Sequence, residues 1–203
     1  MLIVTLLFLF AAMVIHEISH GLVAFGLGDD TAKRAGRLTL NPLPHIDLFW
    51  TIIFPGLLFF TTGGRFMIGM AKPVPVDFSR LRHPKRDMIW VALAGPLSNI
   101  VMAAVLAFFF KMAQNPLFLY GVYMNLGLGA LNLLPLPPLD GSRILAGLLP
   151  VEWAVRYLRI ERYGFLLVLF LYFTGFLMPC VRMGMDLFCW LLGVPSLTQW
   201  LTQ

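Results

Sequence analysis

Apolar residues dominate five long segments of the chain, and polar residues gather in the stretches between them. A transmembrane helix needs about 20 largely apolar residues. Four of the segments approach or exceed that length, whereas the second is shorter. The pattern predicts an all-α polytopic membrane protein, built as a bundle of about five transmembrane helices. The segments are 2–27, 48–62, 88–110, 117–134 and 163–180.

The second segment, 48–62, differs from the others in length and in its interruption by Pro55-Gly56. If it enters and leaves by the same face, 13 of the 15 Lys and Arg residues fall on one side of the membrane. A crossing segment would divide them far more evenly. Because positive residues concentrate on the cytoplasmic side, we expect a re-entrant segment.

Two shorter features complete the predicted architecture. Residues near 36–42 favour extended backbone between Gly36 and Asn41-Pro42, which predicts a short extended or β element. The apolar stretch 181–194 contains charged residues. The sequence leaves open whether that stretch spans the membrane or lies at its surface.

Composition supports a membrane location throughout. The chain is 59% hydrophobic and only 12% charged, whereas soluble domains carry about a quarter charged residues. We therefore expect one membrane-embedded domain over 1–203, with a core of 1–145 and C-terminal helices over 146–203. The net charge of +5 comes from loops between apolar runs, which favours anionic lipid headgroups over nucleic acid as the partner.

The first apolar segment carries an unusual polar group, His16-Glu17-Ile18-Ser19-His20. Residues four apart project from one face of a helix, about 6 Å apart along its axis. Both imidazoles can therefore reach one zinc ion, and Glu17 lies beside it as a candidate catalytic base. An unused carboxylate costs on the order of 3 kcal/mol near the bilayer centre, so a metal centre explains the group better than interhelical hydrogen bonding does.

A catalytic zinc site needs a third protein ligand and an open position for water. Asp140 is the best candidate, because the prolines at 135, 137 and 138 must unwind the fourth apolar segment. We expect Asp140 on non-helical backbone near the inner face. Asn132 borders the same stretch and is a candidate for holding a substrate carbonyl.

The remaining polar candidates have simpler explanations. His45 and His83 each lie beside a proline in loops, where an interfacial location explains both. Asn99 and Asn125 lie in apolar segments, where interhelical hydrogen bonds are the expected role. The two cysteines, Cys180 and Cys189, fit no metal or redox spacing. Asp47 is expected to cap the helix that follows it.

Five ordered motifs in this chain resemble the site-2 protease family of intramembrane zinc metalloproteases, in its minimal form without PDZ or CBS domains. This chain departs from the family pattern in two ways. It has Leu48-Phe49-Trp50-Thr51 where many members carry a proline and a Gly-Thr pair. In many members a further helix precedes the zinc motif, whereas here the helix with the zinc motif comes first. The motifs are His16 to Gly21, Gly36 to Pro42 with His45-Ile46-Asp47, Ala71 to Val76, Ala94 to Asn99, and Asn132 to Gly141.

The resemblance implies that zinc is held by His16, His20 and Asp140, with Glu17 as base and Asn132 near the scissile peptide. The implied reaction is hydrolysis of a peptide bond in or near a transmembrane segment of a membrane-protein substrate. Two alternatives remain open: a non-catalytic scaffold that binds transmembrane segments, and a metal or proton transporter. We expect a bacterial cytoplasmic membrane protein whose site faces the cytoplasm. Nothing in the sequence indicates an oligomeric state.

Overall fold

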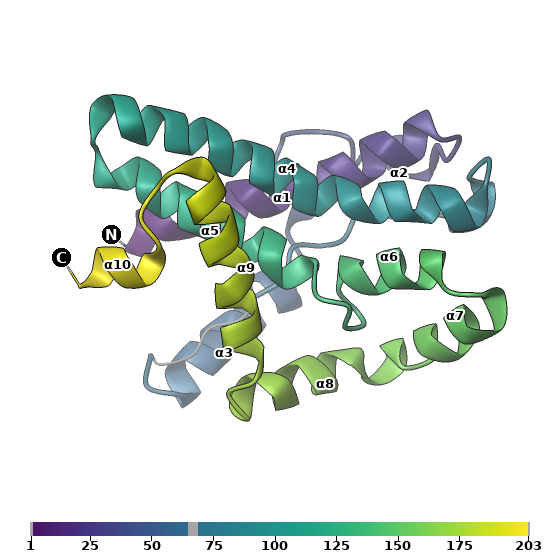
Figure 1. Ribbon diagram of the computed structural model, residues 1–203. Helices are drawn as coiled ribbons and strands as arrows, with labels where there is room; N and C mark the ends of the chain where they lie inside the picture. The colour runs from purple at the N-terminus through teal and green to yellow at the C-terminus, as the bar shows by residue number, and fades with distance from the viewer. Residues whose placement is uncertain (1, 65–68, 203) are drawn as a thin grey trace.

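The computed structural model describes residues 2–64 and 69–202, and within these ranges the secondary structure is entirely helical (Figure 1). The long helices are joined by short helices and irregular loops. The helices are α1 (Leu2–Gly26), α2 (Thr31–Arg34), η1 (Leu43–His45), η2 (Leu48–Ile53), α3 (Phe54–Thr61), η3 (Phe78–Arg80), α4 (Pro84–Ala113), α5 (Pro116–Asn132), α6 (Asp140–Leu148), α7 (Val151–Leu158), α8 (Glu161–Phe173), α9 (Leu177–Leu192) and α10 (Leu197–Leu201).

Helices α1, α4 and α5 form the centre of the fold, and all three pack against one another. Figure 1 shows α1 and α4 running side by side, with α5 returning along them. The turn between α4 and α5 is specified locally. Gln114 adopts the left-handed conformation that ends α4, and the Asn115 side chain accepts a hydrogen bond from the Leu117 amide at the start of α5.

Two helical stretches in the described chain are long and apolar enough to cross a membrane, Leu6–Gly26 and Pro84–Ala113. A third crossing is present if α8 and α9 together form one broken span, since they meet at an angle of 84°. The all-helical class is confirmed, and these apolar helices fit an integral membrane protein. The count of five spans is not established by helix length, because α5 has only 17 residues.

The boundaries of the first, third and fourth apolar segments agree with α1, α4 and α5. The prediction of a continuous fifth segment over 163–180 is wrong. Its helix ends at Phe173, and Gly175, at φ +78°, turns the chain into α9. Glycine adopts this left-handed conformation at little cost. Helix α9 then continues to Leu192 and so includes most of the stretch 181–194.

The segment expected to form a short extended or β element, 36–42, contains no strand. It consists of a turn and bends, because no neighbouring backbone pairs with it as a ladder. The adjoining segment 48–62 is helical over Leu48–Thr61, which is shorter than a membrane span. Asp47 caps this helix as predicted, accepting hydrogen bonds from the amides of Phe49 and Trp50.

Candidate metal centre

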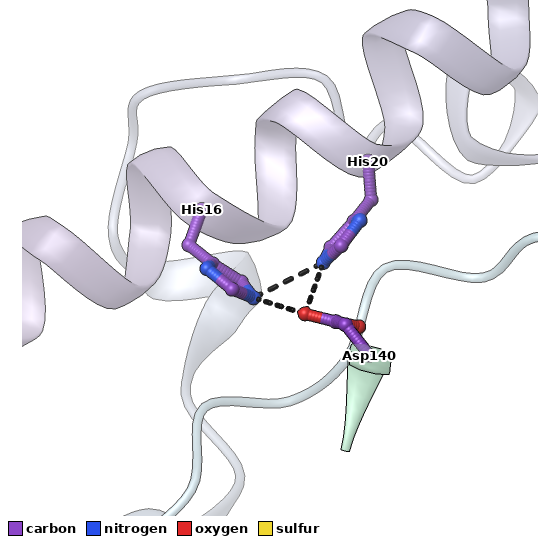
Figure 2. Close-up of side chains that lie close together, drawn as sticks. All are labelled: His16, His20 and Asp140. Carbon is purple, nitrogen blue, oxygen red and sulfur yellow. Dashed lines mark hydrogen bonds and ion pairs between the residues drawn. The ribbon is translucent and has the colours of Figure 1, made fainter. Parts of the chain in front are cut away.

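Three side chains from two distant parts of the sequence meet at one point in the fold (Figure 2). His16 and His20 lie on successive turns of α1, and their Nε2 atoms are 3.0 Å apart. The Oδ2 atom of Asp140 lies 3.0 Å from Nε2 of His16 and 3.3 Å from Nε2 of His20. Both histidines are buried. The structure thus brings together the three residues that the sequence proposed as metal ligands.

Asp140 reaches this point by a route that differs from the expected one. Helix α5 ends at Asn132, as the prolines require, but Asp140 is the first residue of α6 and is not on non-helical backbone. A side chain on Gly141 would collide with the carbonyl oxygens of Leu133 and Leu134. Glycine at this position therefore lets α6 begin directly against the end of α5, which carries Asp140 to the histidines.

The hydrogen bonds on the far side of each imidazole indicate which nitrogens are free. Nδ1 of His16 lies 2.6 Å from Oδ1 of Asn99, and Nδ1 of His20 lies 2.7 Å from the carbonyl oxygen of Val91. Both partners are hydrogen-bond acceptors, so each Nδ1 carries the proton. A neutral histidine protonated at Nδ1 presents the lone pair of Nε2. Both lone pairs point toward Asp140.

The resulting cluster fits a metal ion. Oδ2 of Asp140 is buried and has no hydrogen-bond partner among the described residues. Two nitrogen lone pairs and a carboxylate oxygen lie within 4.8 Å of one another, an arrangement that repels without a cation between them. Two imidazoles and one carboxylate match a catalytic zinc site, which keeps a fourth position open.

Helix α4 leaves space for such an ion. Gly95 faces the two imidazoles, and a Cβ atom there would lie 2.6 Å from Nε2 of His16 and would also collide with Nε2 of His20. Any larger residue would occupy the space beside both ligand atoms. The centre therefore requires a glycine at position 95, because only glycine leaves this space open.

Replacing Gly95 with alanine is expected to lower zinc affinity by at least about tenfold, an effect comparable to losing an outer-shell contact. Gly127→Ala on α5 is the matched control, because a Cβ there meets only Met185 at 3.6 Å or more. Competition with a chromogenic chelator measures both affinities. Equal zinc affinity in the two variants would contradict this role for Gly95.

Glu17 lies beside the three clustered residues and is half-buried. Its Oε2 atom accepts a hydrogen bond of 2.8 Å from the amide of Val74. Because Glu17 follows His16 directly on α1, its side chain leaves the helix at a different angle from the two histidines. The structure therefore places this carboxylate next to the centre but outside the cluster itself.

The segment that carries Val74 is held at both ends. Arg37 donates to the carbonyl of Lys72 at 2.7 Å, and the Asp77 amide donates to Oδ2 of Asp29 at 2.7 Å. Burial opposes ionisation of Asp29, yet hydrogen bonds from Thr31 and from the Asp77 amide lower the pKa of this carboxyl below its usual value. A charged, fully buried Asp29 therefore anchors residues 71–77 against the end of α1.

The other candidates lie outside the cluster. Asn132 is at the end of α5, where its amide donates to the carbonyl of Leu128 in the same helix. His45 is buried within its loop and pairs through Nε2 with the carbonyl of Thr39. His83 is exposed and immediately precedes α4. None of these three belongs to the metal-binding group found among the described residues.

The interhelical hydrogen bonds predicted for Asn99 are confirmed, but sequence reasoning missed that this face of α4 lies against the two histidines. Val91, Gly95 and Asn99 are spaced by four residues and so share one helix face, as His16 and His20 do. This face pairs with the histidines turn by turn, so that Val91 contacts His20 and Asn99 contacts His16. A glycine and an asparagine four apart in an otherwise apolar helix are the signal that identifies such a face.

Comparison with known proteins agrees with this geometry. The model of Peptidase family M50 matches residues 111–175, a range that includes Asp140. The chain is 36% identical over 196 residues to the protein named "Putative zinc metalloprotease YwhC" of Bacillus subtilis (strain 168), covering 88% of this chain and 85% of that protein. No solved structure matches the chain.

Two further relatives are longer than this chain. The protein named "Putative zinc metalloprotease Rip2" of Mycolicibacterium smegmatis is 29% identical to this chain, over 80% of this chain and 64% of its own length. "Zinc metalloprotease MJ0392" of Methanocaldococcus jannaschii is 27% identical over 74% of this chain and 35% of its own length. Zinc is therefore the expected cofactor. The chain belongs to Peptidase family M50, the site-2 protease family of zinc metalloproteases.

Proposed function

We propose that this protein is an intramembrane endopeptidase that hydrolyses a peptide bond in or near a transmembrane segment of a membrane-protein substrate. The observation that carries the proposal is the meeting of His16, His20 and Asp140 on and beside a long apolar helix. A ligand set of two imidazoles and a carboxylate is typical of zinc hydrolases. A scaffold without activity would have no need of this complete set.

Zinc held by these three residues supplies a Lewis acid and lowers the pKa of water toward neutrality. Glu17 then accepts the proton of the attacking water and returns it to the leaving amine, so that the proton is conserved over the reaction. The hydrogen bond from Val74 engages only Oε2 of Glu17. A carboxylate has two oxygens, so Oε1 remains able to take the proton.

We infer that the segment 48–62 is re-entrant and that the centre faces the cytoplasm. Helix Leu48–Thr61 is too short to cross. A re-entrant path keeps the basic loops on both sides of this segment on one face, consistent with the positive-inside rule. It also keeps the ends of α1 and α5 on the same side, as the contact of His20 with Asp140 requires. The five helices that we place in the membrane are then α1, α4, α5 and the bent pair α8 and α9, which together make one crossing.

Within this single domain, the core over 1–145 contains every residue to which we assign chemistry. The C-terminal helices over 146–203 pack around the core, chiefly through α9 against α5. The bacterial cytoplasmic membrane is the location we propose. The partners we propose are a transmembrane protein substrate and the surrounding lipid. Asn132, at the end of α5, is proposed to approach the substrate backbone once a peptide is bound.

A helical substrate must uncoil before its peptide bonds are accessible, and residues 37–40 lie close to the helix that carries the two histidines. Leu38 and Val74 both pack against Gly21, immediately after the second histidine, where a Cβ would meet them at 2.6 and 2.9 Å. The Leu38 amide donates no hydrogen bond within the described chain. We propose that the uncoiled substrate pairs with this stretch as an added strand.

Replacing Leu38 with proline is therefore expected to reduce cleavage by about tenfold or more while zinc content stays normal, because proline has no amide hydrogen to pair with the substrate. Leu38→Ala is the control, since it removes the same side chain but keeps the amide. Cleavage in liposomes and zinc per protein molecule are measured for both. Equal losses in the two variants would mean that the side chain, and not the backbone, matters here.

The proposed function itself is tested with a purified single-span substrate reconstituted in liposomes with this protein. Mass spectrometry of the products is expected to place the cut inside or within a few residues of the spanning segment, and chelation of zinc is expected to stop it. Cleavage confined to a distant soluble region would contradict an intramembrane protease. Zinc flux across the same liposomes without any cleavage would instead favour a transporter.

A further inference from the structure

Among the residues that the structure describes, Asn99 is the one side chain that contacts the Nδ1 atom of a ligand histidine. It lies on α4, is fully buried, and its Oδ1 atom is 2.6 Å from Nδ1 of His16. The corresponding nitrogen of His20 contacts the backbone carbonyl of Val91. The two imidazoles are therefore oriented by different means, one by a side chain and the other by the main chain.

The orientation of the Asn99 amide is fixed by its other contacts. Its Nδ2 atom donates to the carbonyl of Ala12 and to Oδ1 of Asn125, both at 3.3 Å. Nδ2 of Asn125 donates in turn to the carbonyl of Gly121 at 2.9 Å. A backbone carbonyl only accepts hydrogen bonds. The amide nitrogen of Asn99 must therefore face Ala12, and its oxygen must face His16.

This chain of contacts joins α1, α4 and α5 behind the metal centre. Each step has a donor and an acceptor: Asn125 donates to Gly121, Asn99 donates to Asn125 and Ala12, and His16 donates to Asn99. Satisfied polar networks in an apolar interior restrict side chains to one arrangement. Interhelical packing alone does not require the oxygen of Asn99 to point at a ligand nitrogen.

We propose that Asn99 is a positioning residue of the metal centre, which holds His16 in the form protonated at Nδ1 so that Nε2 is free to bind zinc, and that Asn125 fixes the amide of Asn99. This inference rests on the proposed zinc site. Without the acceptor at Asn99, His16 gains access to the other neutral tautomer, in which Nε2 carries the proton and cannot bind a metal. His20 keeps its acceptor in any side-chain variant, because Val91 contributes a backbone oxygen.

The test compares Asn99→Leu with Asn125→Leu in the purified full-length protein. Leucine has a shape similar to asparagine but no polar atoms, and both positions are buried at the same helix interface. We expect zinc affinity to fall about 10- to 100-fold in Asn99→Leu, the usual range for losing an outer-shell partner of a ligand. A smaller fall is expected in Asn125→Leu, where Ala12 still orients the Asn99 amide.

Two further measurements separate positioning from packing. Asn99→Asp keeps an oxygen opposite Nδ1 of His16 and is expected to restore most of the zinc affinity lost in Asn99→Leu. The ¹⁵N chemical shifts of the His16 ring in the zinc-free protein are expected to show Nδ1 protonated in the wild type and a mixture of tautomers in Asn99→Leu. The shifts of His20 are expected to remain unchanged.

The inference is overturned if Asn99→Leu and Asn125→Leu lose the same zinc affinity, if Asn99→Asp is no better than Asn99→Leu, or if the His16 tautomer is the same in all variants. Failure of the proposed zinc site looks different. In that case the His16→Ala variant binds zinc as tightly as the wild-type protein does.

Discussion

Replacing Glu17 with glutamine is expected to reduce peptide-bond cleavage by about 10² to 10⁴-fold, the usual contribution of a general base, while zinc binding is unchanged. Glutamine keeps the shape of the side chain and an oxygen that can accept the hydrogen bond from the Val74 amide. It removes only the ability to take a proton from water. The expected loss is therefore a loss of catalytic rate and not of structure.

Cleavage of a reconstituted single-span substrate, measured together with zinc per protein molecule, checks this expectation. Glu152→Gln on α7 is the matched control, because it makes the same chemical change on an exposed helix away from the centre. That variant is expected to retain full activity. Equal cleavage by the wild type and Glu17→Gln would show that another group takes the proton.

Replacing Asp140 with alanine is expected to lower zinc affinity by more than about a hundredfold, beyond the 10- to 100-fold typical of outer-shell changes, and to abolish cleavage. The carboxylate is the only negatively charged group that meets both ligand nitrogens among the described residues. Without it, two imidazoles from one helix remain. Catalytic zinc sites normally have three protein ligands.

Chelator competition and elemental analysis measure the zinc loss in Asp140→Ala. Asp186→Ala on α9 is the control, because that carboxylate lies outside the cluster. Stoichiometric zinc of unchanged affinity in Asp140→Ala would mean that the third ligand lies elsewhere. The Gly95 and Asn99 variants are expected to fall between wild type and Asp140→Ala.

The sequence predicted most of the helices and the three clustered residues, for local reasons. The four-residue spacing of His16 and His20 places both on one helix face whatever the tertiary structure. The prolines after Asn132 end α5 by removing backbone donors. Both signals act within a few residues of the chain, where sequence patterns are informative.

Features that depend on long-range packing were not predicted. Helices α1 and α4 are apolar almost all round, so their periodicity does not reveal which faces meet. Gly95 and Asn99 therefore had no visible connection to the histidines until the two helices were placed together. The start of α6 at Asp140 was missed for a similar reason, because it depends on the close approach of Gly141 to the end of α5.

The break at Gly175 illustrates a different difficulty. Hydropathy along 163–180 is continuous, and the segment contains both Gly175 and Pro179. Proline is tolerated in the first turn of a helix, and Pro179 lies there in α9. Glycine instead supplied the left-handed residue that turns the chain. The apolar composition thus predicted how far this segment extends, but it did not predict where the chain bends.

X-ray absorption at the zinc edge of the purified, zinc-loaded protein identifies the ligand atoms around the bound ion. With His16, His20 and Asp140 as ligands, we expect two imidazole nitrogens and oxygen ligands at about 2.0 to 2.2 Å, with no sulfur in the coordination shell. Replacing His20 with alanine is expected to remove one imidazole from the spectrum or to abolish binding. A shell that contains sulfur at about 2.3 Å, or one that keeps both imidazoles in His20→Ala, would contradict a centre built from His16, His20 and Asp140.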